Sequence, residues 1–240
     1  MNLAIDIGNS SFKAGVYDRD RKIKVKYSGT ESEDSLAAIM SGYVIRKAII
    51  STVKKENSMI SEYLSRSGVE ISFLNCQTPL PFRIEYRSPS TLGTDRIAAV
   101  AGAYNLFPGL NVLNIDAGTA ITYDLLEADG NYPGGNISPG LDMRFRALHD
   151  YTGRLPLLSR DDSFGNLGVN TENAIRSGVQ SGLIFEINDY IRNLKKRYRD
   201  LKVILTGGDC SYLDAKIDYE HITEQDLVIN GLNYILNYNA

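Results

Sequence analysis

Tryptophan is absent from this chain of 240 residues, and cysteine and histidine occur only twice each. Cys76 and Cys210 are too few for a disulfide framework, and His149 and His221 do not add the closely spaced ligands of a zinc site. The sequence therefore excludes the small disulfide-rich and zinc-stabilised classes of protein. We expect both cysteines to be packing residues.

Long hydrophobic runs are also missing. No segment approaches the ~20 consecutive apolar residues that cross a bilayer, and the amino terminus has no basic segment followed by an apolar stretch. We expect a cytoplasmic protein with no membrane partner.

Neither sign of charge dominates, since 26 basic and 29 acidic residues leave a formal net charge of −3, which argues against a nucleic-acid partner. We interpret the local basic run from Lys195 to Arg199 as the solvated end of a helix.

The chain does contain an ordinary globular composition, 43% hydrophobic and 23% charged, and polar strings that follow apolar strands. The first string starts after residues 3–5 and includes Asp6, Gly8, Asn9, Ser10 and Lys13. Gly8 and Asn9 are typical of a tight turn between two strands. Backbone N–H groups and hydroxyls at such a tip can bind phosphate, and Asp6 can hold the accompanying cation. An ordinary hairpin with a polar tip is the alternative.

A second string, Asp116 to Thr119, repeats this pattern after the apolar residues 112–115. Two strands that end in Asp-x-Gly indicate two similar lobes, each offering a phosphate-binding hairpin to a shared cleft. A third strand, residues 203–205, leads into the pair Gly207 and Gly208. A backbone without Cβ atoms can approach a nucleotide closely there, although a tight turn also accounts for a glycine pair.

Gly93, Thr94, Asp95 and Arg96 form a further string at the start of an expected helix. Helix N-termini attract anions. The Arg96 guanidinium can bind a substrate carboxylate, and Asp95 can accept the proton of a primary hydroxyl. Helix capping by Thr94 or Asp95 is the alternative.

Five strings in this order resemble the motifs of type III pantothenate kinases: residues 6–10, 93–96, 116–119, 134–140 and 206–208. The resemblance spans nearly the whole chain. It implies an α/β fold of the acetate and sugar kinase, heat-shock ATPase and actin superfamily, with two ribonuclease-H-like lobes and ATP between them. We place the lobes at residues 1–108 and 109–240, because Phe107-Pro108-Gly109 interrupts the expected helix. By itself, the glycine-rich segment 134–140 is typical of a surface loop.

The resemblance also implies roles for individual residues. Asp95 is the expected proton acceptor, and Asp116 matches the ligand of a monovalent cation, K⁺ or NH₄⁺. The expected substrate contacts are Tyr86, Gly93, Thr94, Asp95 and Arg96, with Thr171 contributed by the partner subunit of a homodimer. The expected ATP contacts are Asp6, Gly8, Asn9, Ser10, Lys13, Thr119, Gly207 and Gly208, with Asp6 near Mg²⁺ through water.

Three of these residues also have an alternative interpretation. Asp116 is an equally reasonable ligand for a second Mg²⁺. Tyr86 can simply pack on an edge strand, and Thr171 can cap the long helix that it opens.

Hydrophobic periodicity predicts the elements around these strings. Strands are expected over residues 3–5, 12–17, 22–27, 47–51 and 120–126, and helices over 32–40, 58–66, 94–104 and 171–199. In the last helix, Gly178 and Gly182 lie on nearly the same face. They allow a close helix contact within or between subunits, with core packing as the simpler interpretation.

The implied function is ATP-dependent phosphorylation of the primary hydroxyl of pantothenate to 4'-phosphopantothenate, the first step of coenzyme A biosynthesis. One carboxylate suffices for this chemistry, because phosphoryl transfer rests on positioning and charge stabilisation. A non-catalytic nucleotide-binding regulatory or accessory protein of the same fold is the alternative, which Asp95 and Arg96 together disfavour. A filament-forming actin-like ATPase is disfavoured by the short chain and by the string from Gly93 to Arg96.

Overall fold

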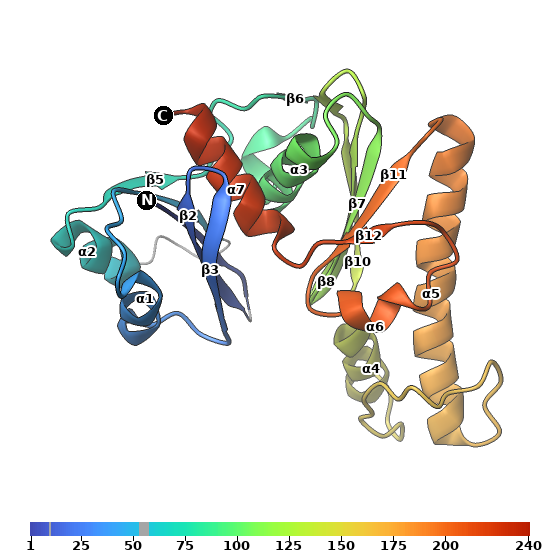
Figure 1. The fold of residues 1–240 in the computed structure, drawn as a ribbon. Coiled ribbons are helices and arrows are strands. Elements are labelled where there is room, and N and C mark those ends of the chain that lie inside the picture. Colours follow the sequence, from blue (N-terminus) through green and yellow to red (C-terminus); the bar gives the residue numbers. More distant parts are fainter. Residues whose placement is uncertain (10, 53–57) are drawn as a thin grey trace. The chain divides into compact units, whose positions relative to one another are not determined.

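The computed structural model describes residues 1–9, 11–52 and 58–240. The predicted phosphate contact Ser10 therefore lies outside the described residues. The chain divides into two compact units (Figure 1), which are described separately. Unit 1 contains Met1–Leu110, Leu125–Gly134 and Asp226–Ala240, and unit 2 contains Asn111–Asp124 and Gly135–Gln225.

Unit 1 is built on a five-stranded sheet in the order β3-β2-β1-β4-β5. Its strands are β1 (Asn2–Ile7), β2 (Phe12–Asp18), β3 (Arg21–Ser28), β4 (Lys47–Thr52) and β5 (Glu70–Phe73). β1, β2 and β3 form an antiparallel meander, whereas β4 and β5 run parallel to β1. This arrangement brings the end of β1 beside both the first hairpin turn and the end of β4.

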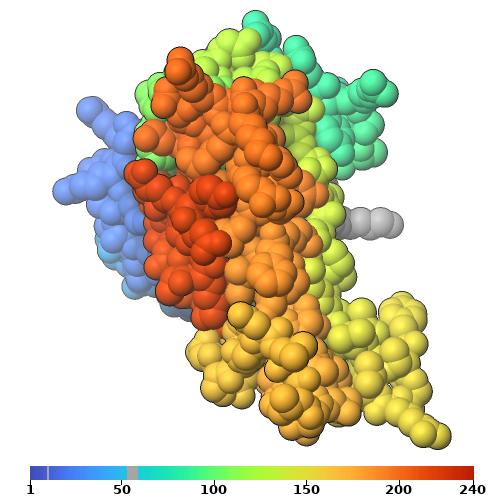
Figure 2. Space-filling model, turned by 90° about the vertical axis from the view of Figure 1, so that its right-hand side faces the viewer, coloured from blue at the N-terminus to red at the C-terminus, as the bar shows by residue number. Residues whose placement is uncertain are grey.

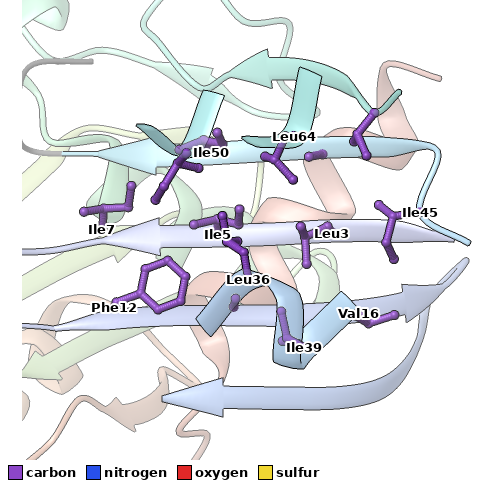
Figure 3. Packing of buried hydrophobic residues seen from close by; sticks show 14 residues of the cluster. Leu3, Ile5, Ile7, Phe12, Val16, Leu36, Ile39, Ile45, Ile50 and Leu64 are labelled. Carbon is purple, nitrogen blue, oxygen red and sulfur yellow. The ribbon is translucent and has the colours of Figure 1, made fainter. Parts of the chain in front are cut away.

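One face of this sheet packs on α1 (Glu33–Met40) and α2 (Ser58–Arg66). Side chains alternate along a strand, so Leu3, Ile5 and Ile7 of β1 all point to this face and are buried there. Figure 3 shows these three residues in one cluster with Leu36 of α1 and Leu64 of α2.

The other face packs on α7 (Leu227–Tyr238), which also crosses α3 (Thr94–Leu106). Two glycines allow the helices to cross closely. A Cβ at Gly102 would clash with the backbone of Leu227, and a Cβ at Gly231 would clash with the backbone of Ala98. A short parallel pair, β6 (Arg83–Ile84) and β9 (Asn131–Tyr132), and the 3-10 turn Pro89–Thr91 also belong to unit 1.

Most of a second five-stranded sheet lies in unit 2, in the order β10-β8-β7-β11-β12. Its strands are β7 (Val112–Ala117), β8 (Ala120–Leu126), β10 (Gly134–Pro139), β11 (Lys202–Thr206) and β12 (Ile222–Thr223). The helices of unit 2 are α4 (Leu141–Asp150), α5 (Thr171–Arg197) and α6 (Cys210–Asp214). α5 packs on β8, where the rings of Tyr123 and Tyr190 stack with centroids 4.2 Å apart.

The predicted helices and strands are present with small differences at their ends, and the basic run closes α5 as predicted. Two interpretations were wrong. Residues 134–139 form β10 and not a surface loop, because they pair with β8. Cys76 is exposed, so only Cys210 is a packing residue.

The glycines of α5 also depart from the simplest expectation. A Cβ at Gly178 or Gly182 would meet nothing within 4 Å, so core packing does not account for these glycines. The predicted lobe boundary between residues 108 and 109 stays a prediction, and segments 125–134 and 226–240 group with the amino-terminal part of the chain. No helix in the described part of the chain is long and apolar enough to span a membrane.

Candidate functional site

The first hairpin carries the predicted phosphate-binding string of unit 1. Asp6 is buried near the end of β1, and its register partner on β2 is Lys13. The turn closes through a hydrogen bond of 2.9 Å from the Gly8 backbone N–H to the Ser11 backbone oxygen. A Cβ at Gly8 would lie 2.9 Å from Ser11 Oγ, so glycine fits this tight turn better than larger residues do.

Ser51 connects this hairpin to the start of α3. It is the register partner of Asp6 on β4, and its side chain is buried. Its Oγ shares a hydrogen bond of 3.0 Å with Thr94 Oγ1. The end of β1 and the string that begins at Gly93 therefore meet within unit 1. Ser51 was not predicted from the sequence as a site residue, although a small hydroxyl residue at the end of a strand was a signal for one.

The start of α3 directs the Asp95 carboxylate back onto the helix. Gly93 occupies the N-cap position and makes no side-chain cap. Asp95 Oδ1 accepts a hydrogen bond of 2.8 Å from the Arg96 backbone N–H. A Cβ at Gly93 would clash with this same oxygen. Asp95 thus binds a first-turn N–H, as the capping alternative expected, whereas the Thr94 hydroxyl bonds to Ser51 on β4.

Arg96, Tyr86 and Gly134 lie together beside this helix start. Arg96 is only 5% exposed, and its guanidinium lies over the Tyr86 ring with 5.8 Å to the centroid. A Cβ at Gly134 would lie 3.0 Å from Tyr86 Cδ2. The structure therefore brings the predicted substrate contacts of unit 1 together: Tyr86, Gly93, Thr94, Asp95 and Arg96.

In unit 2, the second carboxylate string forms the turn between β7 and β8. The Gly118 backbone N–H donates to the Ala120 backbone oxygen at 3.1 Å, and the Gly140 N–H donates to the Thr119 oxygen at 3.1 Å. A Cβ at Gly140 would clash with the carbonyl oxygens of Gly118 and Thr119. The last residue of the glycine-rich segment therefore closes onto the turn that carries Thr119.

Gly207, in the string of residues 206–208, packs against Asp116. Its φ of +93° lies in the left-handed region that favours glycine, and a Cβ there would clash with Asp116 Oδ1. Thr206 on β11 is the register partner of Asp116 on β7. The Asp209 backbone N–H donates to the Ala117 oxygen at 2.9 Å. The strings that contain Asp116, Gly140 and Gly207 thus converge within unit 2.

Asp209 also ties this region to the segment that precedes α5. Its Oδ1 lies 2.8 Å from Arg160 Nη1. Burial raises the pKa of the Asp209 carboxyl, and the Arg160 guanidinium offsets part of this rise. Neither residue was predicted from the sequence, because their pairing joins positions far apart in the chain.

Thr171 is the first residue of α5 and is exposed. The cap of this helix is Asn170, whose side chain accepts a hydrogen bond of 2.8 Å from the Asn173 backbone N–H. The capping interpretation of Thr171 was therefore wrong by one residue. The Thr171 side chain does not serve as the N-cap of α5.

A partly buried network of side chains braces the glycine-rich strand β10. Arg144 Nη2 of α4 donates to Glu186 Oε2 of α5 at 2.6 Å and to Ser138 Oγ at 2.8 Å, and the Tyr123 hydroxyl donates to Glu186 Oε1 at 2.8 Å. Burial alone would raise the pKa of Glu186, but the hydrogen bonds from Arg144, Tyr123 and Ser138 outweigh it and lower the pKa. Burial, followed by the bond to Glu186, raises the pKa of Tyr123.

The carboxylates at these turns are of the kind that a phosphate-bound Mg²⁺ uses. Within the described ranges, no group of three or more His, Cys, Asp or Glu side chains is arranged to hold a metal ion. Mg²⁺ at phosphate sites takes one or two carboxylates and completes its shell with phosphate oxygens and water. Asp6 and Asp116, each at the end of a strand beside a glycine turn, supply such carboxylates.

Comparison with known proteins gives one consistent result. A family model described as type III pantothenate kinase matches residues 2–193. A type III pantothenate kinase of Bacteroides fragilis is 46% identical over 239 residues, which cover 100% of this chain and 98% of that protein.

Two solved structures show the fold. A conserved putative Baf family transcriptional activator from Campylobacter jejuni superposes with a TM-score of 0.64 at 23% identity, covering 99% of this chain and 98% of that one. A putative 2-dehydro-3-deoxygalactonokinase from Sinorhizobium meliloti superposes with a TM-score of 0.59 at 14% identity, covering 100% and 99%. These likenesses confirm the predicted α/β fold class.

Proposed function

This chain belongs to the type III pantothenate kinase family and phosphorylates pantothenate with ATP in coenzyme A biosynthesis, and we propose that Asp95 accepts the proton of the reacting hydroxyl. The observation that carries this assignment is the start of α3, where the Asp95 carboxylate accepts the Arg96 backbone N–H and the buried Arg96 guanidinium lies over the Tyr86 ring. A carboxylate and a guanidinium at one helix start suit an acceptor that has both a hydroxyl and a carboxylate.

The proposed reaction needs little from the protein beyond positioning. The hydroxyl oxygen of pantothenate forms a bond to the γ-phosphorus of ATP, the bond from that phosphorus to the bridging oxygen breaks, and ADP leaves. The hydroxyl proton passes to an Asp95 carboxylate oxygen. The transition state is loose, so the nucleophile loses its proton late and a weak base suffices. Aspartate has a reference pKa of about 3.9 and is ionised at neutral pH. Arg96 holds the substrate carboxylate in a fork of N–H donors.

We assign the phosphates of ATP to the two hairpins and the glycine pair. In unit 1 the proposed contacts are Asp6, Gly8, Asn9, Ser10 and Lys13, and in unit 2 they are Thr119, Gly207 and Gly208. The tight turn at Gly8 and the left-handed backbone at Gly207 support this assignment, because glycine turns at strand ends let phosphate approach the backbone closely. Mg²⁺ bound with ATP neutralises charge on the phosphates, and Asp6 would hold it through water.

Asp116 is the proposed ligand of a monovalent cation, K⁺ or NH₄⁺. Its Oδ1 lies so close to Gly207 that any side chain at residue 207 would clash with it. Glycine at this position therefore leaves the carboxylate accessible to an ion. Thr206 and the backbone oxygen of Ala117 lie beside it on the paired strands β11 and β7. Carboxylate, hydroxyl and carbonyl oxygens are ligands that suit hard cations.

We also propose that the enzyme is a cytoplasmic homodimer in which Thr171 reaches the pantothenate site of the partner subunit. Thr171, Gly178, Gly182 and Phe185 follow one another at helical spacing and so share one face of α5. Phe185 is 64% exposed, and the space beside both glycines is open. Figure 2 shows α5 running along the surface of unit 2. A second copy of this helix would cover the apolar face and approach closely at the glycines.

Incubation of the purified protein with ATP, Mg²⁺ and pantothenate tests the proposal. ADP release should depend on pantothenate and should match the formation of 4'-phosphopantothenate. An analogue that lacks the terminal hydroxyl should bind in competition with pantothenate and release no ADP. ADP release that is equally fast without pantothenate would instead indicate an ATPase and would contradict the proposed acceptor.

A further inference from the structure

Tyr27 lies beside the proposed phosphate-binding lysine. Asp6 on β1 pairs with Lys13 on β2, and Lys13 pairs with Tyr27 on β3. Side chains at paired positions of antiparallel strands project from the same face. Accordingly, the Lys13 ammonium lies over the Tyr27 ring, 5.9 Å from its centroid. Tyr27 is 50% exposed, so it borders the solvent from which a nucleotide arrives.

The other end of the Tyr27 side chain is anchored. Its hydroxyl donates a short hydrogen bond to Asp226 Oδ1, and Lys22 Nζ lies 2.5 Å from Asp226 Oδ2. Asp226 is 9% exposed and immediately precedes α7, which packs on the same sheet. The charge of Lys22 compensates that of Asp226, so the carboxylate remains available as an acceptor. The phenol ring is therefore fixed both at its backbone and at its hydroxyl.

We propose that Tyr27 is a positioning residue for the phosphates of ATP and acts through Lys13. The inference rests on the proposed role of Lys13. A lysine side chain has four flexible carbons, and holding it in one place costs conformational entropy when the ligand binds. A fixed aromatic face attracts the ammonium and restricts it before the nucleotide arrives. The Asp226 bond keeps that face in place.

Two substitutions separate the ring from its anchor. Tyr27→Leu removes both, and it should raise the KM for ATP and the Kd for ADP by about 2- to 5-fold, the range of a cation–π contact at an exposed site. Tyr27→Phe keeps the ring and should raise both constants less. The KM for pantothenate should not change in either variant. Titration calorimetry with ADP measures binding without turnover.

Tyr43 provides a matched control, because Lys24 Nζ lies over its ring at the same 5.9 Å. Tyr43→Leu should leave both nucleotide constants unchanged, and melting temperatures should be measured for every variant. An increase of the ATP constants in Tyr43→Leu equal to that in Tyr27→Leu would show a general effect of losing an aromatic residue from unit 1. That result would overturn the inference.

A double-mutant cycle with Lys13→Met decides whether Tyr27 acts through Lys13. If it does, Tyr27→Leu has no further effect on the Kd for ADP once Lys13 is replaced. An equal effect in both backgrounds, or no effect in either, would overturn the role of Tyr27. If Lys13→Met itself leaves the Kd for ADP and the KM for ATP unchanged, the proposed role of Lys13 fails first, and the inference fails with it.

Discussion

The carboxylate of Asp95 is held by the first turn of its own helix. One oxygen accepts the Arg96 backbone N–H at 2.8 Å, and a carboxylate has further lone pairs for a second donor. The positive end of the helix dipole favours the ionised form. A base held in this way loses little entropy when the substrate binds, because its orientation is already set.

We predict that Asp95→Asn lowers kcat by about 10²- to 10⁴-fold, the range for the loss of a positioned acid or base. Asparagine has nearly the same shape, and its amide oxygen can still accept the Arg96 N–H. The fold, the melting temperature and the Kd for ADP should therefore be close to wild type. Steady-state kinetics and calorimetry check this prediction. Turnover at the wild-type rate would contradict the assignment of Asp95.

Gly93→Ala provides an independent control for the position of the carboxylate. A Cβ there would clash with Asp95 Oδ1, which is the end of a flexible side chain and can move away. The alanine variant should therefore keep its stability but lose part of its kcat, with a rate between those of wild type and Asp95→Asn. Unchanged kcat with a displaced carboxylate in a crystal structure would show that its exact placement is unimportant.

The carboxylate of Asp116 leads to a prediction about cations. If it holds a monovalent ion, replacing Na⁺ by K⁺ or NH₄⁺ at fixed Mg²⁺ should raise kcat/KM for ATP, because Na⁺ is smaller and more strongly hydrated. Asp116→Asn should reduce the difference between the two ions as well as the rate. Equal rates in Na⁺ and K⁺ for the wild type would favour the alternative, a second Mg²⁺ at Asp116.

At the scale of helices and strands, local patterns predicted the elements that carry alternating or helical runs of apolar residues. β2 and α2 are examples, and both begin at the predicted residue. β10 was misjudged because Gly134, Gly135 and Pro139 carry turn propensity, and the pairing with β8 that overrides it is a tertiary contact. The missed helix α7 contains Gly231, which looks like a helix breaker but is needed where the helix crosses α3.

The same limit applies to the site. Residues such as Asp6, Asp95 and Asp116 stand out because polar residues and glycine follow apolar runs directly. Ser51 and Tyr27 do not stand out, because an ordinary serine or tyrosine in a strand becomes significant only through its cross-strand neighbour. Register is a property of the folded sheet, and local sequence patterns do not specify it across separate strands.

The network around Glu186 joins β8, β10, α4 and α5, so it leads to a prediction about stability. Glu186→Gln should lower the free energy of unfolding at pH 7 by about 1–3 kcal/mol, because the Arg144 guanidinium loses its charged partner. The Arg144 and Glu186 side chains are only 20% and 24% exposed, so solvent screens the pair incompletely. Urea unfolding of both proteins measures the difference. Glu172→Gln is the matched control on the same helix, since Glu172 is 60% exposed in its pair with Arg176, and its loss should cost at most about 0.5 kcal/mol.

The pH dependence of this difference follows from the lowered pKa of Glu186. The folded protein binds a proton at this group less readily than the unfolded chain does. The stabilisation is therefore fully present above the unfolded pKa of about 4.3 and is lost as the pH falls through the folded value. Since glutamine does not titrate, the difference in stability between the wild type and Glu186→Gln should shrink as the pH falls from the unfolded pKa toward the lower folded pKa. A difference that does not shrink as the pH falls below the unfolded pKa would contradict the ionic role of the network.

At the scale of the whole chain, the two sheets repeat one strand order, with β1 and β7 in the same central position. Each of these strands carries an aspartate, and each aspartate pairs with a hydroxyl residue on the next parallel strand, Ser51 for Asp6 and Thr206 for Asp116. One helix, α1, lies between β3 and β4, whereas two helices, α4 and the long α5, lie between β10 and β11. The equivalent strands and the segments that follow them thus carry the proposed phosphate contacts, and the proposed dimer face lies on the longer of the two helices between β10 and β11.

The proposed dimer can be tested by mixing two inactive variants. Asp95→Asn removes the proton acceptor, and Thr171→Arg is expected to block the pantothenate pocket of the partner subunit. Each variant alone should be nearly inactive, because every site in its homodimer carries one lesion. In a mixed dimer with a shared site, one site carries both lesions, and the other combines an intact Asp95 with an intact Thr171.

Co-expression of the two variants with different affinity tags should therefore restore activity. If dimers assort at random, about half are mixed and each has one intact site of two, so roughly a quarter of the wild-type activity is expected from closed two-fold symmetry. Tandem purification through both tags should raise this value to roughly one half, because only mixed dimers remain. If both residues serve the site of their own subunit, every site in the mixed dimer still carries one lesion. An inactive preparation of verified mixed dimers would then show that Thr171 does not cross the interface, whereas recovery near one half can arise only from a site that two chains build together.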